Sequence, residues 1–173
     1  MYPLKLLLTG ALVVSASAVA ANAAPTSIGS FNAWSAYVST EAGGKTCFAA
    51  SQPQNSKYSR KIGNRGDTFF MITTIPAKKI TNEASTIIGF PFKAGSDVSA
   101  EIDGTKYKMF FNDAAGETAW SVPDTEPALV AAMKKGRTMT VASVSGRGTD
   151  VTDTYSLSGV SAALDAAAKE CAK

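Results

Sequence analysis

The sequence predicts a mainly β protein, either an antiparallel β-sandwich or a curled sheet, with two short α-helices of which the last packs on the sheet. Three observations carry this prediction. Short β-branched and alternating runs recur between turn signals, an Asp-Gly pair joins two of them, and two stretches show helical spacing. A length of 173 residues suits one domain with a substantial core.

The first 23 residues predict a secretory signal peptide. Lys5 supplies the positive start, residues 6–19 form an apolar run, and Ala21-Asn-Ala23 gives the small-x-small cleavage pattern. An uncleaved anchor is the weaker alternative, because the run is shorter than the roughly 20 residues that a membrane span needs. We therefore expect one mature domain over residues 24–173, periplasmic or secreted, with outer-membrane association left open.

Composition and charge exclude several functional classes. Removing the signal takes away Lys5 and no acid, so the net charge falls from +3 to +2, too little to demand a polyanionic partner. We expect no nucleic-acid partner. The chain contains no histidine, which excludes histidine-dependent acid–base catalysis and the common His-rich metal sites. We assign no cofactor, no metal site and no transmembrane span after cleavage.

Two cysteines, Cys47 and Cys171, both belong to the mature part. An even count in an oxidising compartment predicts a disulfide, with two free buried thiols as the alternative. The bond would join an early strand to the end of the chain. Because it closes a long loop, the chain-entropy model assigns it at most about 4–5 kcal/mol.

The first predicted strand covers residues 31–38, where Trp34 and every second residue after it lie on one face. Residues 45–50 form its partner and carry Cys47. The polar stretch 51–64 contains proline and glycine and predicts a long exposed loop.

Residues 67–75 are nearly continuous in apolar and β-branched side chains, which predicts a central strand buried on both faces. Residues 83–90 form another strand. Asp103-Gly104 then joins residues 97–102 to 105–111, a signal for a two-residue type I′ hairpin.

The hairpin register follows from its side chains. With Ile102 opposite Thr105, the apolar residues gather on one face, and Glu101 comes opposite Lys106 on the other. A slip of one residue would expose the apolar set.

Residues 117–122 predict a short strand carrying Trp120. A helix follows that begins after Asp124 or Thr125, holds Pro127 in its first turn and stops at Gly136.

The last third combines two strands, residues 137–145 and 151–157, separated by the glycine-containing turn 145–148. Ser158 is the predicted N-cap of a final helix. Helical spacing directs Cys171 of this helix toward the sheet.

Several segments in this order are similar to one known family: Arg65-Gly-Asp-Thr-Phe-Phe-Met-Ile-Thr73, Gly89-Phe-Pro-Phe-Lys93, Met133-Lys-Lys-Gly136, Ser145-Gly-Arg-Gly-Thr149 and Asp153-Thr-Tyr-Ser-Leu-Ser-Gly159. They resemble the invasion-associated locus B proteins over nearly all of the mature chain, although Val160 stands where an aromatic residue is expected. The resemblance implies a small exported protein of Gram-negative bacteria with a mostly β fold and no established enzymatic activity. A role in invasion does not follow from membership alone.

Candidate interaction or turn residues are Arg147, Asp150, Asp153 and Tyr155. A carboxylate pair beside an arginine can act as acid and base or bind a cation. The structural interpretation is favoured: Asp150 supports the turn, and Asp153 pairs with Arg147 or caps a backbone N–H. Arg65-Gly-Asp67 spells an integrin-binding tripeptide, which a turn leading into a strand explains as well.

Trp34 and Trp120 are candidate surface aromatics, with burial in the core as the competing interpretation. Either one would mark a partner site if it were exposed.

The leading hypothesis is an exported, non-catalytic cell-envelope protein that contacts an envelope or host-surface protein, as an accessory subunit or an invasion-associated factor. We assign no catalytic residue, and the oligomeric state is open. One alternative is a periplasmic hydrolase using Asp or Ser-Lys chemistry, with Lys134 or Lys135 as base. Another is a small-ligand binder, which requires an enclosed apolar cavity.

Overall fold

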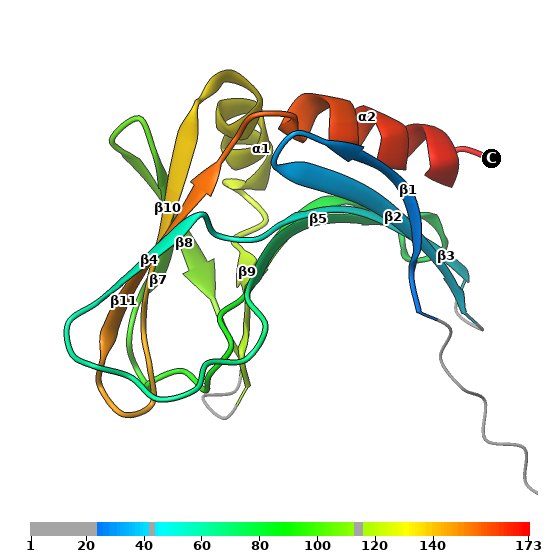
Figure 1. Ribbon diagram of the computed structural model, residues 1–173. Coiled ribbons are helices and arrows are strands. Elements are labelled where there is room, and N and C mark those ends of the chain that lie inside the picture. The colour runs from blue at the N-terminus through cyan, green and yellow to red at the C-terminus, as the bar shows by residue number, and fades with distance from the viewer. Residues whose placement is uncertain (1–23, 42–43, 113–115) are drawn as a thin grey trace, which may run out of the picture.

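The computed structural model describes residues 24–41, 44–112 and 116–173, so the predicted signal peptide lies outside the described residues. Eleven strands form one sheet in the order β1-β2-β3-β5-β6-β9-β8-β7-β10-β11-β4. Neighbouring strands are antiparallel throughout. The sheet curls strongly without pairing its edge strands β1 and β4 in this part of the chain (Figure 1). This confirms the fold class and selects the curled sheet.

The N-terminal side of the sheet consists of β1 (Thr26–Phe31), β2 (Trp34–Glu41), β3 (Gly44–Ser51), β5 (Phe69–Ile75) and β6 (Ile80–Ile87). The predicted strand over residues 31–38 corresponds to β2, but its start is wrong, because Phe31 ends the separate strand β1 and β2 begins at Trp34. Asn32 takes a left-handed backbone conformation with φ of 55°, which asparagine tolerates better than most residues, and reverses the chain.

A missed strand, β4 (Asn55–Tyr58), lies within the stretch predicted as loop. It pairs with β11 (Asp150–Ser156), where Ser56 lies opposite Asp153. The stretch is polar because β4 is an edge strand, and its Ser56 contacts the charged side chains of Asp153 and Arg65. The segment that forms β4 therefore lacks the alternation of hydrophobic and polar residues by which a strand is predicted.

Strand β5 is buried on one face only, which corrects the predicted burial of both. Phe70 and Ile72 are buried, whereas Phe69 and Met71 are partly exposed and Asp67 precedes the strand. The reason is that both α-helices contribute to the same buried cluster as Phe70 and Ile72, so the other face of β5 carries no described helix. Strand β6 begins three residues earlier than predicted, after the 3-10 helix Pro76–Lys78.

The hairpin of β7 (Val98–Ile102) and β8 (Thr105–Phe110) has the predicted register, with Ile102 opposite Thr105 and Glu101 opposite Lys106. Asp103 and Gly104 have φ of 49° and 79°, as a type I′ turn requires. Strand β9 (Thr118–Ser121) and strand β10 (Thr138–Val144) complete the sheet.

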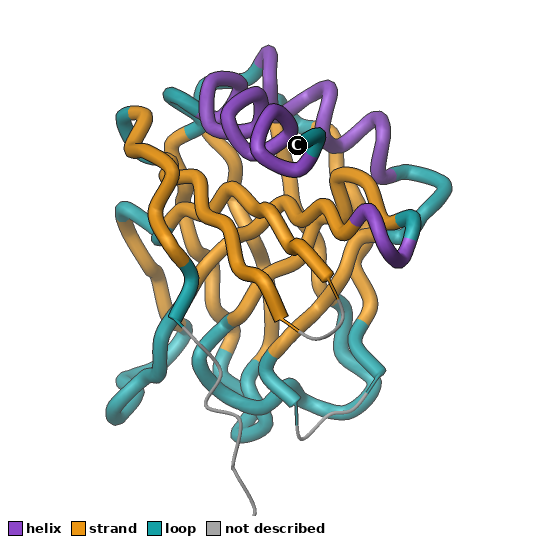
Figure 2. The backbone as a smooth tube through the Cα atoms, turned by 90° about the vertical axis from the view of Figure 1, so that its right-hand side faces the viewer, coloured by secondary structure: helices purple, strands orange, loops and turns teal. Residues whose placement is uncertain are grey.

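Helix α1 (Glu126–Lys135) starts after Thr125 and ends at Gly136, as predicted. Helix α2 (Val160–Cys171) lies along β1, β2 and β3 (Figure 1). The two α-helices lie above the strands, and most connecting loops gather at the opposite end (Figure 2). For the described residues, no helix is long and apolar enough to cross a membrane.

The predicted serine N-cap of α2 is wrong. Gly159 is the N-cap, with φ of 93°, and no side chain caps this end. A Cβ atom at Gly159 would lie 1.8 Å from the carbonyl oxygen of Phe31. The helix therefore begins where the chain passes directly over the end of β1, and only glycine fits there.

Helix α2 is fastened to the sheet at both ends. Cys171 forms a disulfide with Cys47 of β3, with Cα atoms 5.9 Å apart. Lys45 Nζ donates a hydrogen bond of 3.1 Å to the carbonyl oxygen of Glu170. At the start of the helix, Ala33 N donates to the carbonyl oxygen of Ser158 at 3.2 Å. The predicted disulfide thus joins an early strand to the end of the chain.

Candidate recognition site

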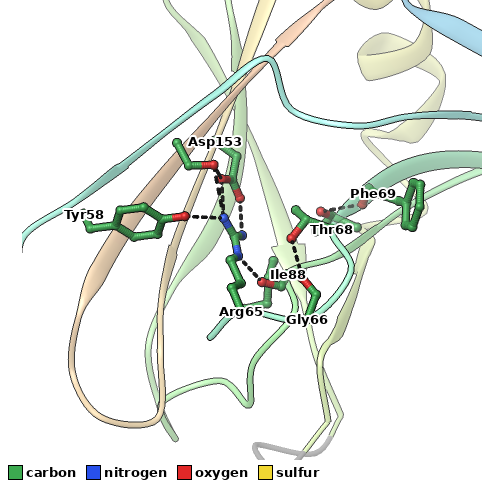
Figure 3. A network of polar contacts seen from close by, with 9 residues as sticks. Tyr58, Arg65, Gly66, Thr68, Phe69, Ile88 and Asp153 are labelled. Atoms are coloured by element: carbon green, nitrogen blue, oxygen red, sulfur yellow. Dashed lines mark hydrogen bonds and ion pairs between the residues drawn. The ribbon is translucent and has the colours of Figure 1, made fainter. Parts of the chain in front are cut away.

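The most buried charged group in the described chain is the carboxylate of Asp153, which is 0% exposed on the inward face of β11. Its partner is Arg65, in the segment of residues 59–68 that links β4 to β5 (Figure 3). Arg65 Nη1 donates to Oδ1 at 2.7 Å and Nη2 to Oδ2 at 2.6 Å. This two-pronged, charge-assisted geometry is the strongest form of an arginine–carboxylate contact.

The remaining surroundings of Arg65 hold its guanidinium in place. Nε donates to the carbonyl oxygen of Ile88 at 2.7 Å, and Nη1 to the Tyr58 hydroxyl at 3.2 Å. The guanidinium carbon also lies 4.9 Å from the centre of the Phe90 ring. Burial disfavours the charged form, but the hydrogen bonds and charge of Asp153, aided by Tyr58, raise the pKa of Arg65 above its ordinary value. Arg65 therefore stays positively charged, and its guanidinium is used for contacts within the protein.

Hydrogen bonds hold the 59–68 segment at several further points. Ser59 N donates to the carbonyl oxygen of Asp150 at 3.0 Å, and Arg60 Nη2 to that of Gly148 at 2.8 Å. Farther along, Gly66 N donates to the carbonyl oxygen of Gly89 at 2.9 Å. The segment thus bridges β11 and the loop after β6.

A pocket of about 670 Å³ lies beside this segment. Arg60 and Lys61 line it from the segment, Arg147 from the turn before β11, and Phe90 from the loop after β6. The acid among its described lining residues is Glu117. The pocket lining therefore combines positively charged and apolar side chains.

The turn 145–149 places Arg147 at the pocket. Ser145 organises this turn: its carbonyl oxygen accepts from Gly148 N at 2.7 Å, and its Oγ accepts from Thr149 N at 3.1 Å. Gly146 N donates to the carbonyl oxygen of Pro91 at 2.7 Å. Ser145, rather than the predicted Asp150, therefore supplies the side-chain hydrogen bond described within this turn.

The predicted pairing of Asp153 with Arg147 is also wrong. Asp153 pairs with Arg65, while Arg147 is exposed. The sequence contained one signal that Asp153 needs a cationic partner, because Asp153 alternates with Val151 and Tyr155 on an apolar face. Several arginines of the chain could supply that cation, so this signal did not identify Arg65. The integrin-binding interpretation of Arg65-Gly-Asp67 fails for the same reason, since its arginine is bound internally.

Aromatic candidates lie in different environments. Trp34 is fully buried, with its Nε1 donating to the carbonyl oxygen of Ser156 at 2.9 Å, so its prediction as a surface residue is wrong.

Tyr155 is fully buried and edge-on to Phe70, with ring centres 5.9 Å apart. Burial and the charge of Asp153 raise the pKa of Tyr155 well above the tyrosine range. Trp120 is half-buried beside exposed Phe110 and stays a candidate surface residue.

The groups that the hydrolase hypothesis needs do not converge. Ser145 and Arg147 line the pocket, but Asp150 and Asp153 are not part of its lining. Asp153 is bound to Arg65, and Lys134 lies at the exposed end of α1. Within residues 24–41, 44–112 and 116–173, no three Cys, Asp or Glu side chains are grouped to hold a metal ion. The hydrolase hypothesis required these groups to meet in one pocket, and in the described residues they do not.

Comparison with known proteins shows the family to which this chain belongs and a solved structure with a similar fold. Residues 34–168 match the family described as invasion associated locus B (IalB) protein. The crystal structure of invasion associated protein B from Bartonella henselae is similar, with a TM-score of 0.54 and 16% sequence identity over 86% of this chain and 99% of that chain. At that identity the similarity shows the fold. No curated protein matches the chain. Because the family match spans most of the sequence and confirms the resemblance of its motifs, this chain belongs to the invasion associated locus B family.

Proposed function

We propose that the chain is an exported, non-catalytic protein of the cell envelope that works by contacting an envelope or host-surface protein. The observation that carries the proposal is membership of the invasion associated locus B family. That description and the name of the Bartonella henselae protein concern invasion. For this chain, the corresponding role is an accessory subunit or an invasion-associated factor.

Export is supported by two independent features. The first 23 residues carry the signal-peptide pattern, and Cys47 is bonded to Cys171. Disulfides persist in oxidising compartments such as the periplasm and are rare in the cytosol. The periplasm or the outside of the cell is therefore the proposed location.

A contact role is supported by the way the charged groups are used. The buried Arg65–Asp153 pair fixes the 59–68 segment, which carries the exposed cations Arg60 and Lys61, and Arg147 lines the same pocket. A fixed backbone beneath surface groups reduces the entropy lost on binding.

The test is affinity capture of the tagged protein from cells cross-linked before lysis, in one arm from the envelope and in another from host-cell membranes. We expect at least one protein to be enriched over a control in which a tagged, exported protein of another family is captured. Absence of an enriched protein in both arms would contradict the proposal. A hydrolase would instead be indicated by turnover of an envelope substrate that Ser145→Ala abolishes.

A further inference from the structure

We propose that the pocket between the 59–68 segment and the 145–149 turn binds a small phosphate monoester that carries an apolar substituent. The proposal concerns a ligand and stands apart from the protein partner proposed above. It rests on charge, wall composition and rigidity.

The charge of the pocket suits a dianion. Arg60, Lys61 and Arg147 contribute three positive charges, and Glu117 contributes one negative charge, which leaves two positive charges in the described lining. A phosphate monoester carries about −1.5 to −2 at neutral pH, because its second pKa is about 6. Guanidinium groups also match phosphate oxygens in pairs, which favours phosphate over a carboxylate of charge −1.

The pocket lining also contains apolar side chains. Ile62, Phe90 and Pro91 contribute them, and Phe90 lies against the guanidinium of Arg65. A free phosphate ion would leave this apolar surface in water. An ester with an alkyl or acyl substituent would cover it, and a volume of about 670 Å³ lies within the ordinary range for small-molecule sites.

Hydrogen bonds join the pocket walls before any ligand arrives. Arg60 Nη2 bonds to the Gly148 carbonyl oxygen at 2.8 Å, and Gly146 N bonds to the Pro91 carbonyl oxygen at 2.7 Å. Behind them, the Arg65–Asp153 pair fixes the segment that carries Arg60 and Lys61. Binding therefore orders the exposed side chains of Lys61 and Arg147 but little of the backbone that carries them, which limits its entropic cost.

The experiment is calorimetric titration of the purified protein with hexyl phosphate at low salt, compared with inorganic phosphate and hexanoate. We expect saturable binding of hexyl phosphate, at least several-fold tighter than binding of either comparison compound. Dihexanoyl phosphatidic acid, used below its micelle concentration, asks whether a lipid headgroup is accepted as well as a free ester. Binding of either phosphate ester supports the site. The ratio of the two affinities shows whether the site prefers a lipid headgroup or a free ester.

Variants decide whether the binding occurs in this pocket. Lys61→Gln and Arg147→Gln each remove an exposed cation and are expected to weaken binding roughly tenfold. The matched control is Lys134→Gln, an exposed cation on α1 outside the pocket lining, which should leave the affinity unchanged. Circular dichroism verifies that each variant is folded. The proposal is overturned if neither phosphate ester binds, if inorganic phosphate binds as tightly, or if the pocket variants bind like the control.

Discussion

Nη2 of Arg65 lies 2.6 Å from Oδ2 of Asp153, across a sequence separation of 88 residues. The contact joins the 59–68 segment to the inward face of β11, with the carboxylate fully buried and the arginine side chain 10% exposed. Together with the hydrogen bonds of Ser59, Arg60 and Gly66, this ion pair holds a long connection against the sheet.

Removing Asp153 should destabilise the protein strongly. Asp153→Ala leaves a buried arginine without its counter-charge, so we expect the free energy of unfolding to fall by about 3–5 kcal/mol, measured by urea denaturation. Asp150→Ala is the matched control, because this neighbouring acid is exposed, and its effect should stay within about 0.5 kcal/mol. Equal effects of the two substitutions would contradict the role assigned to the pair.

The disulfide should contribute most of its stabilisation through the long loop that it closes. Cys47 and Cys171 are 124 positions apart, and the Cys47→Ala/Cys171→Ala variant should lose up to about 4–5 kcal/mol of unfolding free energy. Hydrogen exchange should show the last turns of α2 losing protection first. An unchanged melting temperature with unchanged exchange would rule out this function of the bond.

Gly159 should tolerate no side chain. Gly159→Ala combines a φ of 93° with a Cβ atom 1.8 Å from the carbonyl oxygen of Phe31, so we expect a loss well above about 1–3 kcal/mol in a thermal melt. Gly95→Ala is the control, since Gly95 also has positive φ, of 71°, but has no atom within 4 Å of an added Cβ. If both variants melt alike, backbone conformation alone explains the requirement for glycine at position 159.

Glu83 should make stability depend on pH. Burial and the nearby charge of Glu126 raise the pKa of Glu83, partly opposed by Lys78. A raised folded-state pKa means that the stabilisation is present below the unfolded pKa and is lost as the pH rises through the folded pKa. Glu83→Gln should therefore raise the melting temperature at pH 7 by about 1–3 °C and have no such effect near pH 3. Asp165→Asn, at an exposed position on α2, should show no such difference.

Local signals allowed the sequence to predict the most regular parts of the fold. Asp103-Gly104 sets the hairpin register because turn and strands are adjacent in the chain, and Gly136 marks the end of α1 for the same reason. Cysteine count and compartment were enough to predict the bond between Cys47 and Cys171.

The candidate site depends on contacts between distant segments and could not be predicted in the same way. Strand β4 is polar because it pairs at an edge, so its sequence resembles a loop. Asp153 required a cation, but nothing local distinguished Arg65 from Arg147 as its source. Gly159 was missed as an N-cap because the obstacle to a side chain is Phe31, which belongs to the first strand of the sheet.

Export of this chain and formation of its bond between β3 and α2 outside the cytoplasm are both open to a single measurement. The most direct measurement is to separate the cell fractions, quench each with acid to stop thiol exchange, and alkylate the denatured protein with a high-mass maleimide. We expect the processed protein in the periplasmic or external fraction, with Cys47 and Cys171 both protected until a reductant is added. Unprocessed protein in the cytoplasmic fraction, with both cysteines alkylated directly, would contradict the account.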